Sequence, residues 1–226
     1  MTYRTLEELR TELLARLGMG AMGASGGANA TLINSFLRNG QAQLYRLQDW
    51  KHLQDYDEET TGVGQNLYDY PTAGTMGTAG CARDKRILRI ETTIGGQYLC
   101  LREGINTEQW TNMETRGSPQ RYERYAQIMI YPKSEAAYTM RRWFVADLGR
   151  FTQNSDRATL DDEMILLHAL ANAKAHYRQP DAKTYEGQLN ALLASLRTQS
   201  FSSGGVYQRE PQGEVERRPL LVGRDI

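Results

Sequence analysis

The chain has 226 residues and carries 27 Lys or Arg against 27 Asp or Glu, so its formal net charge is zero. A neutral chain lacks the basic excess expected of a protein that coats DNA through charge alone. Its two cysteines, Cys81 and Cys100, are too few for a disulfide-stapled secreted fold, so we expect two reduced thiols in a cytoplasmic product.

The N-terminus predicts a soluble protein with no signal peptide and no membrane partner. It has no apolar core, and no stretch of the chain approaches the roughly 18 apolar residues of a membrane helix. The first predicted element is a helix that begins with Thr5 as N-cap, and Glu8 completes a capping box. Gly18 ends this helix, whose apolar stripe consists of Leu6, Leu9, Leu13, Leu14 and Leu17.

A glycine-rich segment, residues 18–29, is predicted to be a loop before a longer helix. It has five glycines and no large side chain except two methionines, so it cannot build a core. Gly40 weakens the middle of the following helix by about 1 kcal/mol relative to Ala. That helix is predicted from about Ala30 to Leu53, with an apolar face of Ile33, Leu37, Leu44, Leu47 and Trp50.

The pattern changes to strands between about Gln54 and Leu148. The dipeptide Gly95-Gly96 joins Ile87–Ile94 to Gln97–Leu101 and predicts a hairpin. Short strands with polar turns indicate an antiparallel sheet or a small barrel. The other elements predicted here are strands at Leu67–Tyr70, Tyr122–Tyr125, Ile128–Tyr131 and Ala137–Val145, and a short helix at Thr107–Met113.

Two helices are predicted after about Leu160, and together they form a helical hairpin. The first is apolar over more than half of its circumference, so we expect burial on two sides and contacts between subunits at Leu166, Leu170 and Tyr177. Residues 178–181 break it. The second helix is amphipathic, with Tyr185, Leu189, Leu192, Leu193 and Leu196 on one face.

These elements predict an α+β fold in which helices from both chain ends form a bundle and an antiparallel β-subdomain is inserted between them. The predicted divisions are residues 1–53 for the N-terminal helices, 54–150 for the β insertion, 151–200 for the C-terminal helical hairpin, and 201–226 for an extended tail.

No motif in the chain indicates catalysis, a metal site or a cofactor. Gly18–Gly23 has the spacing of a dinucleotide-binding fingerprint, and Gly23–Gly27 that of a nucleophile elbow around Ser25, but neither follows a predicted strand. The three histidines, His52, His168 and His176, have no metal-binding spacing. We therefore predict a protein that is not an enzyme.

Two charged clusters have structural interpretations. The acidic run Asp161–Glu163 opens a helix, where negative charge is favourable against the helix dipole, and Asp57–Glu59 is predicted on a solvated strand edge. Arg141–Phe144 interleaves basic and aromatic residues as single-strand binders do, but alternation along a strand with outward arginines explains it better.

The order of these elements and several short motifs resemble phage head–tail adaptors, also called connector or gatekeeper proteins, of the podovirus type. The resemblance covers about residues 30–200. The motifs that carry it are Ile33–Tyr45 with Trp50, Tyr68–Pro71, Pro119 with Tyr122, Ile128–Pro132 and Asp162–Ile165.

The resemblance implies a virion protein made in the host bacterial cytoplasm. It implies a ring of subunits, usually twelve, that links the portal protein to the tail nozzle and surrounds the channel through which genomic DNA passes. No catalytic residue is carried over, because the matching motifs are structural. Near-zero net charge is compatible with a channel in which DNA must slide without binding.

The tail from about residue 200 is extended but not simply polar, which predicts that it binds a partner. Gly204-Gly205 and two prolines prevent a helix. In adaptors a C-terminal extension commonly reaches the portal, so the resemblance makes the portal the expected partner. The residues expected to bind it are Val206, Tyr207, Arg217, Arg218, Pro219, Leu220, Leu221 and Val222.

Two alternative functions remain open from the sequence. One is a glycan-cleaving hydrolase that aids entry, which would require two opposed carboxylates in a cleft. The other is a small DNA-binding module, which would require a basic face on the β insertion.

Overall fold

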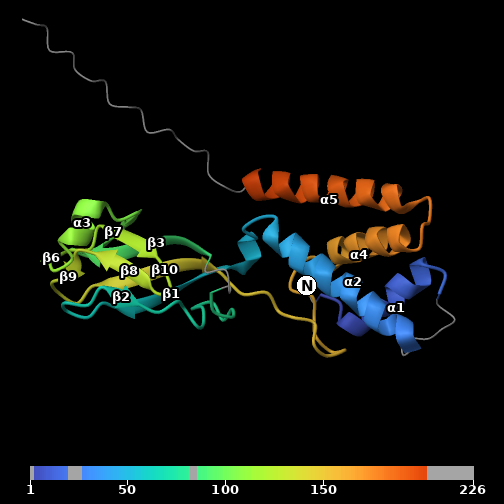
Figure 1. Cartoon of the computed structure of the whole chain (residues 1–226), viewed down its shortest axis with the longest axis horizontal. Coiled ribbons are helices and arrows are strands. Elements are labelled where there is room, and N and C mark those ends of the chain that lie inside the picture. The colour runs from blue at the N-terminus through green and yellow to red at the C-terminus, as the bar shows by residue number, and fades with distance from the viewer. Residues whose placement is uncertain (1–2, 20–26, 82–85, 203–226) are drawn as a thin grey trace, which may run out of the picture.

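The computed structural model describes residues 3–19, 27–81 and 86–202. Within these ranges the protein is a mixed α+β structure with five α-helices and predominantly antiparallel sheets. Four helices gather at one end of an elongated molecule and the strands at the other (Figure 1). These four are α1 (Leu6–Arg16), α2 (Gly27–Arg46), α4 (Asp162–His176) and α5 (Ala182–Ser202).

Helix α1 begins and ends as predicted. The Thr5 hydroxyl accepts a hydrogen bond from Glu8 N at 3.3 Å, and Thr5 N donates to the Glu8 carboxylate at 2.7 Å, which completes the capping box. Leu17 is the C-cap, and Gly18 follows with a φ of 76°, a left-handed conformation that glycine adopts without strain. All five leucines of the predicted stripe are buried.

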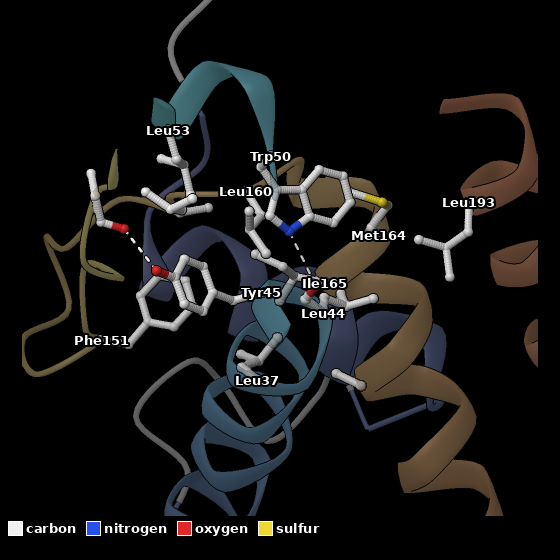
Figure 2. Packing of buried hydrophobic residues seen from close by; sticks show 14 of the residues in the cluster. Leu37, Leu44, Tyr45, Trp50, Leu53, Phe151, Leu160, Met164, Ile165 and Leu193 are labelled. Atoms are coloured by element: carbon white, nitrogen blue, oxygen red, sulfur yellow. Dashed lines mark hydrogen bonds between the residues drawn. The ribbon is translucent and has the colours of Figure 1, made fainter. Parts of the chain in front are cut away.

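Helix α2 differs from the prediction at both ends, because it begins at Gly27 and ends at Arg46 rather than near Leu53. The chain turns after Arg46 and forms a 3-10 turn, Lys51–Leu53. Trp50 folds back over the helix end, where its Nε1 donates to Leu44 O at 3.2 Å (Figure 2). Trp50 is buried, whereas Leu47, predicted on the same face, is 48% exposed.

Helix α4 contacts α1, α2 and α5. Its side chains that are completely buried include Ile165, Leu166 and Leu170. Gly40 of α2 faces α4 so closely that a Cβ at this position would lie 3.0 Å from His168 Nδ1. The glycine that looked like a weak point in the sequence thus allows close approach of two helices.

Helix α5 packs on α4 through the amphipathic face predicted from sequence. Leu189 and Leu193 are buried, and Tyr185, Leu192 and Leu196 are partly buried against the same core. The helix extends to Ser202, two residues beyond the expected boundary at 200.

The β region holds two four-stranded sheets, ordered β1-β10-β3-β4 and β2-β8-β7-β5, and a two-stranded sheet, β6-β9. It also contains the short helix α3 (Thr107–Thr111). The strands are β1 (Gln54–Thr60), β2 (Leu67–Tyr68), β3 (Ile87–Ile94), β4 (Gln97–Cys100), β5 (Arg102–Glu103), β6 (Arg116–Gly117), β7 (Arg121–Arg124), β8 (Ile128–Tyr131), β9 (Lys133–Ser134) and β10 (Thr139–Val145).

Pairing in these sheets is mostly antiparallel, as predicted, and the described strands do not close into a barrel. The predicted hairpin is β3–β4, and Gly95 and Gly96 turn it with φ values of 60° and 81°. Two pairings of two residues each, β5 with β7 and β6 with β9, are parallel and were not anticipated. Side chains from both larger sheets, including Ile90, Phe144 and Ile130, enter one buried cluster.

Candidate assembly surface

The residues predicted to form subunit contacts are largely buried within the fold of the single chain. Leu166 and Leu170 have 0% exposure, and Tyr177 is half-buried. The excess apolar surface of α4 that suggested a second subunit is covered by α1, α2 and α5 of the same chain. This corrects the reasoning behind the assignment, because a side chain already buried by its own fold needs no neighbour to cover it. Subunit contacts at these three residues stay a prediction, without that support.

The predicted portal-binding residues, Val206 to Val222, lie outside the described residues, and so does Ser25 of the glycine-rich segment. Cys81 and Cys100 do not form a disulfide bond. Among the described residues, no group of three or more His, Cys, Asp or Glu side chains has a geometry that could hold a metal ion. None of the described helices is long and apolar enough to cross a membrane.

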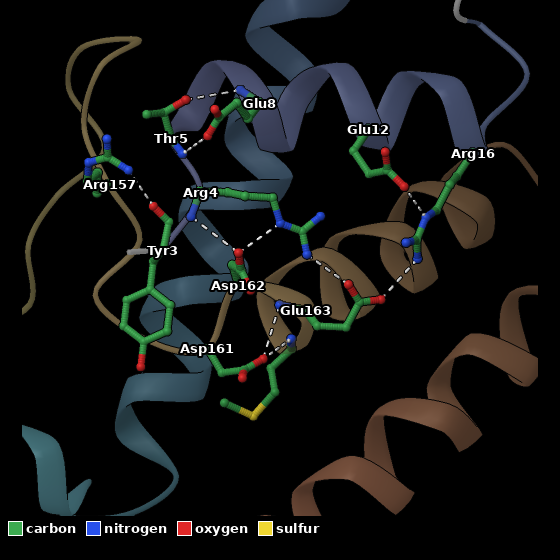
Figure 3. A network of polar contacts seen from close by, with 11 residues as sticks. Tyr3, Arg4, Thr5, Glu8, Glu12, Arg16, Arg157, Asp161, Asp162 and Glu163 are labelled. Atoms are coloured by element: carbon green, nitrogen blue, oxygen red, sulfur yellow. Dashed lines mark hydrogen bonds and ion pairs between the residues drawn. The ribbon is translucent and has the colours of Figure 1, made fainter. Parts of the chain in front are cut away.

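The acidic run at the start of α4 is structural, which confirms its interpretation as favourable charge at a helix N-terminus. Asp161 is the N-cap, and its Oδ1 accepts from Glu163 N and Met164 N, both at 3.1 Å. Arg4 pairs with Asp162 at 2.8 Å and with Glu163 at 2.9 Å (Figure 3). Burial would raise the pKa of Asp162, but hydrogen bonds from Arg4 hold it below its usual value.

His168 also has a structural environment. Its Nε2 lies 2.9 Å from Gln43 Oε1, and its Nδ1 lies 3.0 Å from Asn172 Nδ2. Those partners define a neutral ring in which Nε2 donates and Nδ1 accepts. Burial lowers the pKa of His168, which favours the same neutral form.

The two arginines of β10 point to opposite faces of the sheet, so the prediction of outward arginines was right for Arg141 and wrong for Arg142. Arg142 is 4% exposed and forms ion pairs with Asp57 and Glu59 of β1. Its Nη1 also donates to Asp69 O at 2.6 Å. Adjacent strand residues face opposite ways, so only one of two consecutive arginines can point outward.

On the outward face, side chains from four adjacent strands form a connected surface that we call the ladder face. Arg141 lies at its centre, with its guanidinium carbon 4.7 Å from the Tyr56 ring centre and 4.0 Å from that of Tyr98. Its Nη2 pairs with Glu58 Oε1 at 2.6 Å. The ladder face consists of Tyr56, Glu58, Arg89, Glu91, Tyr98, Arg141 and Trp143.

Arg89 repeats this arrangement beside Trp143. Its guanidinium carbon lies 4.7 Å from the Trp143 ring centre, and its Nε pairs with Glu91 Oε1 at 3.0 Å. Trp143 Nε1 donates to Glu91 Oε2 at 3.0 Å, and its ring lies 5.0 Å from that of Tyr56. These contacts hold the aromatic and guanidinium groups in defined orientations before any partner binds.

The ladder face has the composition of a protein–protein contact. Tyr, Trp and Arg are the residues enriched where proteins bind one another tightly. Each arginine is neutralised by a glutamate, so the face does not offer the free cations that would track a nucleic-acid backbone. Sequence reasoning found Arg141 and Trp143 but not the face, because its other members come from strands whose pairing register was unknown.

A protein-family model described as SU10 adaptor protein matches residues 1–210, and the chain belongs to this family. A search of curated proteins finds no match. The family supports a structural role as a phage head-to-tail adaptor, that is, a virion component that associates with other head and tail proteins. The resemblance noted in the sequence is thereby confirmed at the level of the family.

Proposed function

We propose that this protein forms a ring of twelve subunits that joins the portal protein to the tail nozzle and encloses the channel through which genomic DNA passes. The observation that carries the proposal is the adaptor-family match over residues 1–210. The subunit is made in the host cytoplasm and assembles on the portal, which acts as the template for the ring. No step of this role requires an active site.

The ladder face is the surface we propose to meet the neighbouring copy in the ring. Every subunit of a closed ring must offer a face to the next one. This face carries two arginines and two glutamates already paired, so it does not repel a surface of either sign. Tyr98 is 41% exposed, which leaves aromatic surface available for burial.

The C-terminal tail is proposed to anchor the subunit to the portal. Its apolar and basic residues, which lie between Val206 and Val222, begin four residues after the end of α5. An extended segment of this composition binds by adding to a sheet edge or by lying in a groove of its partner.

The decisive experiment is electron cryomicroscopy of purified portal particles mixed with the full chain. We expect a twelve-fold ring of this protein at the tail-facing end of the portal. Density at any other place on the particle, or the absence of a ring, would overturn the proposal.

Two variants test the parts separately. A chain that ends at Ser202 keeps α5 complete, and we expect it to stay folded but to lose portal binding.

Trp143→Ala should leave portal binding of single subunits intact and impair ring closure. Trp110→Ala is the matched control, because Trp110 is a 40% exposed tryptophan on α3, outside the ladder face. Equal ring formation by the two tryptophan variants would contradict the assignment of the ladder face.

A further inference from the structure

A short connector crosses α2 on its way from β10 to α4. Residues 146–152, which we call the strap, are fixed to the helix through three backbone carbonyls. The Tyr45 hydroxyl donates to Ala146 O at 2.8 Å, Gln41 Nε2 donates to Gly149 O, and Arg38 Nε donates to Phe151 O at 2.7 Å. Each contact uses a long side chain of α2, so the strap is attached to the helix at three points along its length.

A hollow of about 650 Å³ lies between the strap and α2. This volume is within the range of roughly 300–1,000 Å³ typical of ligand pockets in proteins. Part of its lining is apolar and comes from both sides, from Ala42 and Tyr45 on α2 and from Leu148 and Phe151 on the strap. Tyr45 and Phe151 are themselves buried among the hydrophobic residues of the core (Figure 2), so their rings are held in place where they line the hollow.

The charged lining of this hollow is unbalanced. Three arginines, Arg38, Arg46 and Arg150, line it together with one carboxylate, Asp147. The Asp147 side chain accepts a hydrogen bond from Leu148 N at 2.9 Å, which holds it against its own backbone. The lining therefore carries an excess of two positive charges in a chain whose net charge is zero.

These arginines differ from those that pair with carboxylates elsewhere in the protein. Arg4, Arg141 and Arg142 each form an ion pair with a carboxylate of this chain. None of the three arginines of the hollow forms an ion pair with another described residue, and all three are exposed. Exposed guanidinium groups around an apolar cavity are suited to carboxylates that flank an apolar side chain.

We propose that the hollow binds a short acidic segment of a partner protein, with an apolar side chain between the strap and α2 and flanking carboxylates on the arginines. Nucleic acid is the less suitable ligand, because a phosphate backbone makes no use of the apolar walls. The proposal goes beyond the adaptor role and does not depend on which virion protein supplies the segment. If the hollow binds no such segment, the proposal that the protein forms a ring on the portal is unaffected.

Fluorescence anisotropy with the full chain tests this directly. The probe is a labelled eight-residue peptide of alternating Glu and Leu, and the comparison probes are the same peptide with Gln for Glu and a single-stranded DNA octamer. We expect saturable binding of the acidic peptide, weakening as salt is added, and at least tenfold weaker binding of both other probes. Equal or tighter binding of the Gln peptide or of DNA would overturn the proposal, as would absence of binding.

Charge reversal locates the binding. Arg46→Glu and Arg150→Glu should each weaken binding of the acidic peptide by tenfold or more, whereas Arg102→Glu, at an exposed arginine on β5, should leave it unchanged. Arg46→Gln removes one charge without adding another, and we expect an intermediate effect. Thermal unfolding of each variant shows that the fold is retained. Unchanged binding by both charge-reversed hollow variants would show that the peptide binds elsewhere.

Discussion

Arg142 is the charged residue whose removal we expect to destabilise the protein most. Its side chain is 5% exposed, and it holds Asp57, Glu59 and a backbone carbonyl together in the interior of the β region. Removing one partner of a buried ion pair costs about 3–5 kcal/mol, because the remaining charge has no counter-ion. The Asp57 and Glu59 side chains are 18% and 40% exposed, so water offsets part of this cost. We therefore expect Arg142→Ala to lower the free energy of unfolding by about 3 kcal/mol.

Urea unfolding followed by circular dichroism measures this loss, and the neighbouring arginine supplies the matched control. Arg141 is 24% exposed and its partner Glu58 is 39% exposed, so Arg141→Ala should cost about 1 kcal/mol or less. Asp57→Asn should fall between the two, since Arg142 keeps Glu59 as a partner. Equal losses for the two arginine variants would refute the reasoning, because they would show that burial of the ion pair does not set its contribution.

Three further predictions concern the helices. Burial lowers the pKa of His168 below 6.5, so the neutral ring contributes its full stability above that pH and loses it as the pH falls towards the folded-state value. The melting temperature of the wild type should therefore drop between neutral pH and about pH 5.5, and His168→Gln should reduce that drop. Gly40→Leu should cost about 1–3 kcal/mol by forcing α2 away from α4. Asp161→Ala should cost about 1 kcal/mol through loss of the N-cap of α4.

Each of these has its own control. The His168 prediction would be contradicted if acidification lowered the melting temperatures of the wild type and of His168→Gln by the same amount. Gly187→Leu on α5 controls the second, because no atom lies within 4 Å of a Cβ there, and comparable losses at the two glycines would contradict it. Asp161→Asn keeps a capping oxygen and should restore most of the stability that Asp161→Ala loses. If both variants at Asp161 unfold alike, the capping argument is wrong.

The candidate surfaces were only partly predictable. The ladder face needs residues from four strands in one register, and a bulge between Trp143 and Phe144 shifts that register. No local sequence pattern indicates this shift in register. The hollow depends on how the strap crosses α2, two segments about 100 residues apart. The tail residues predicted to bind the portal could be identified from composition, and they stay a prediction.

The sequence by itself determined the features that depend on neighbouring residues. Thr5 and Glu8 are three residues apart and form a capping box wherever the helix lies, and Gly95-Gly96 turns a hairpin because both residues adopt positive φ. Only the tertiary structure decided that α2 ends at Arg46, where Trp50 is more favourably buried across the helix end than as part of a continued helix. It also decided that Arg142 points inward, because the burial of a charge depends on partners such as Asp57, 85 residues away in the chain.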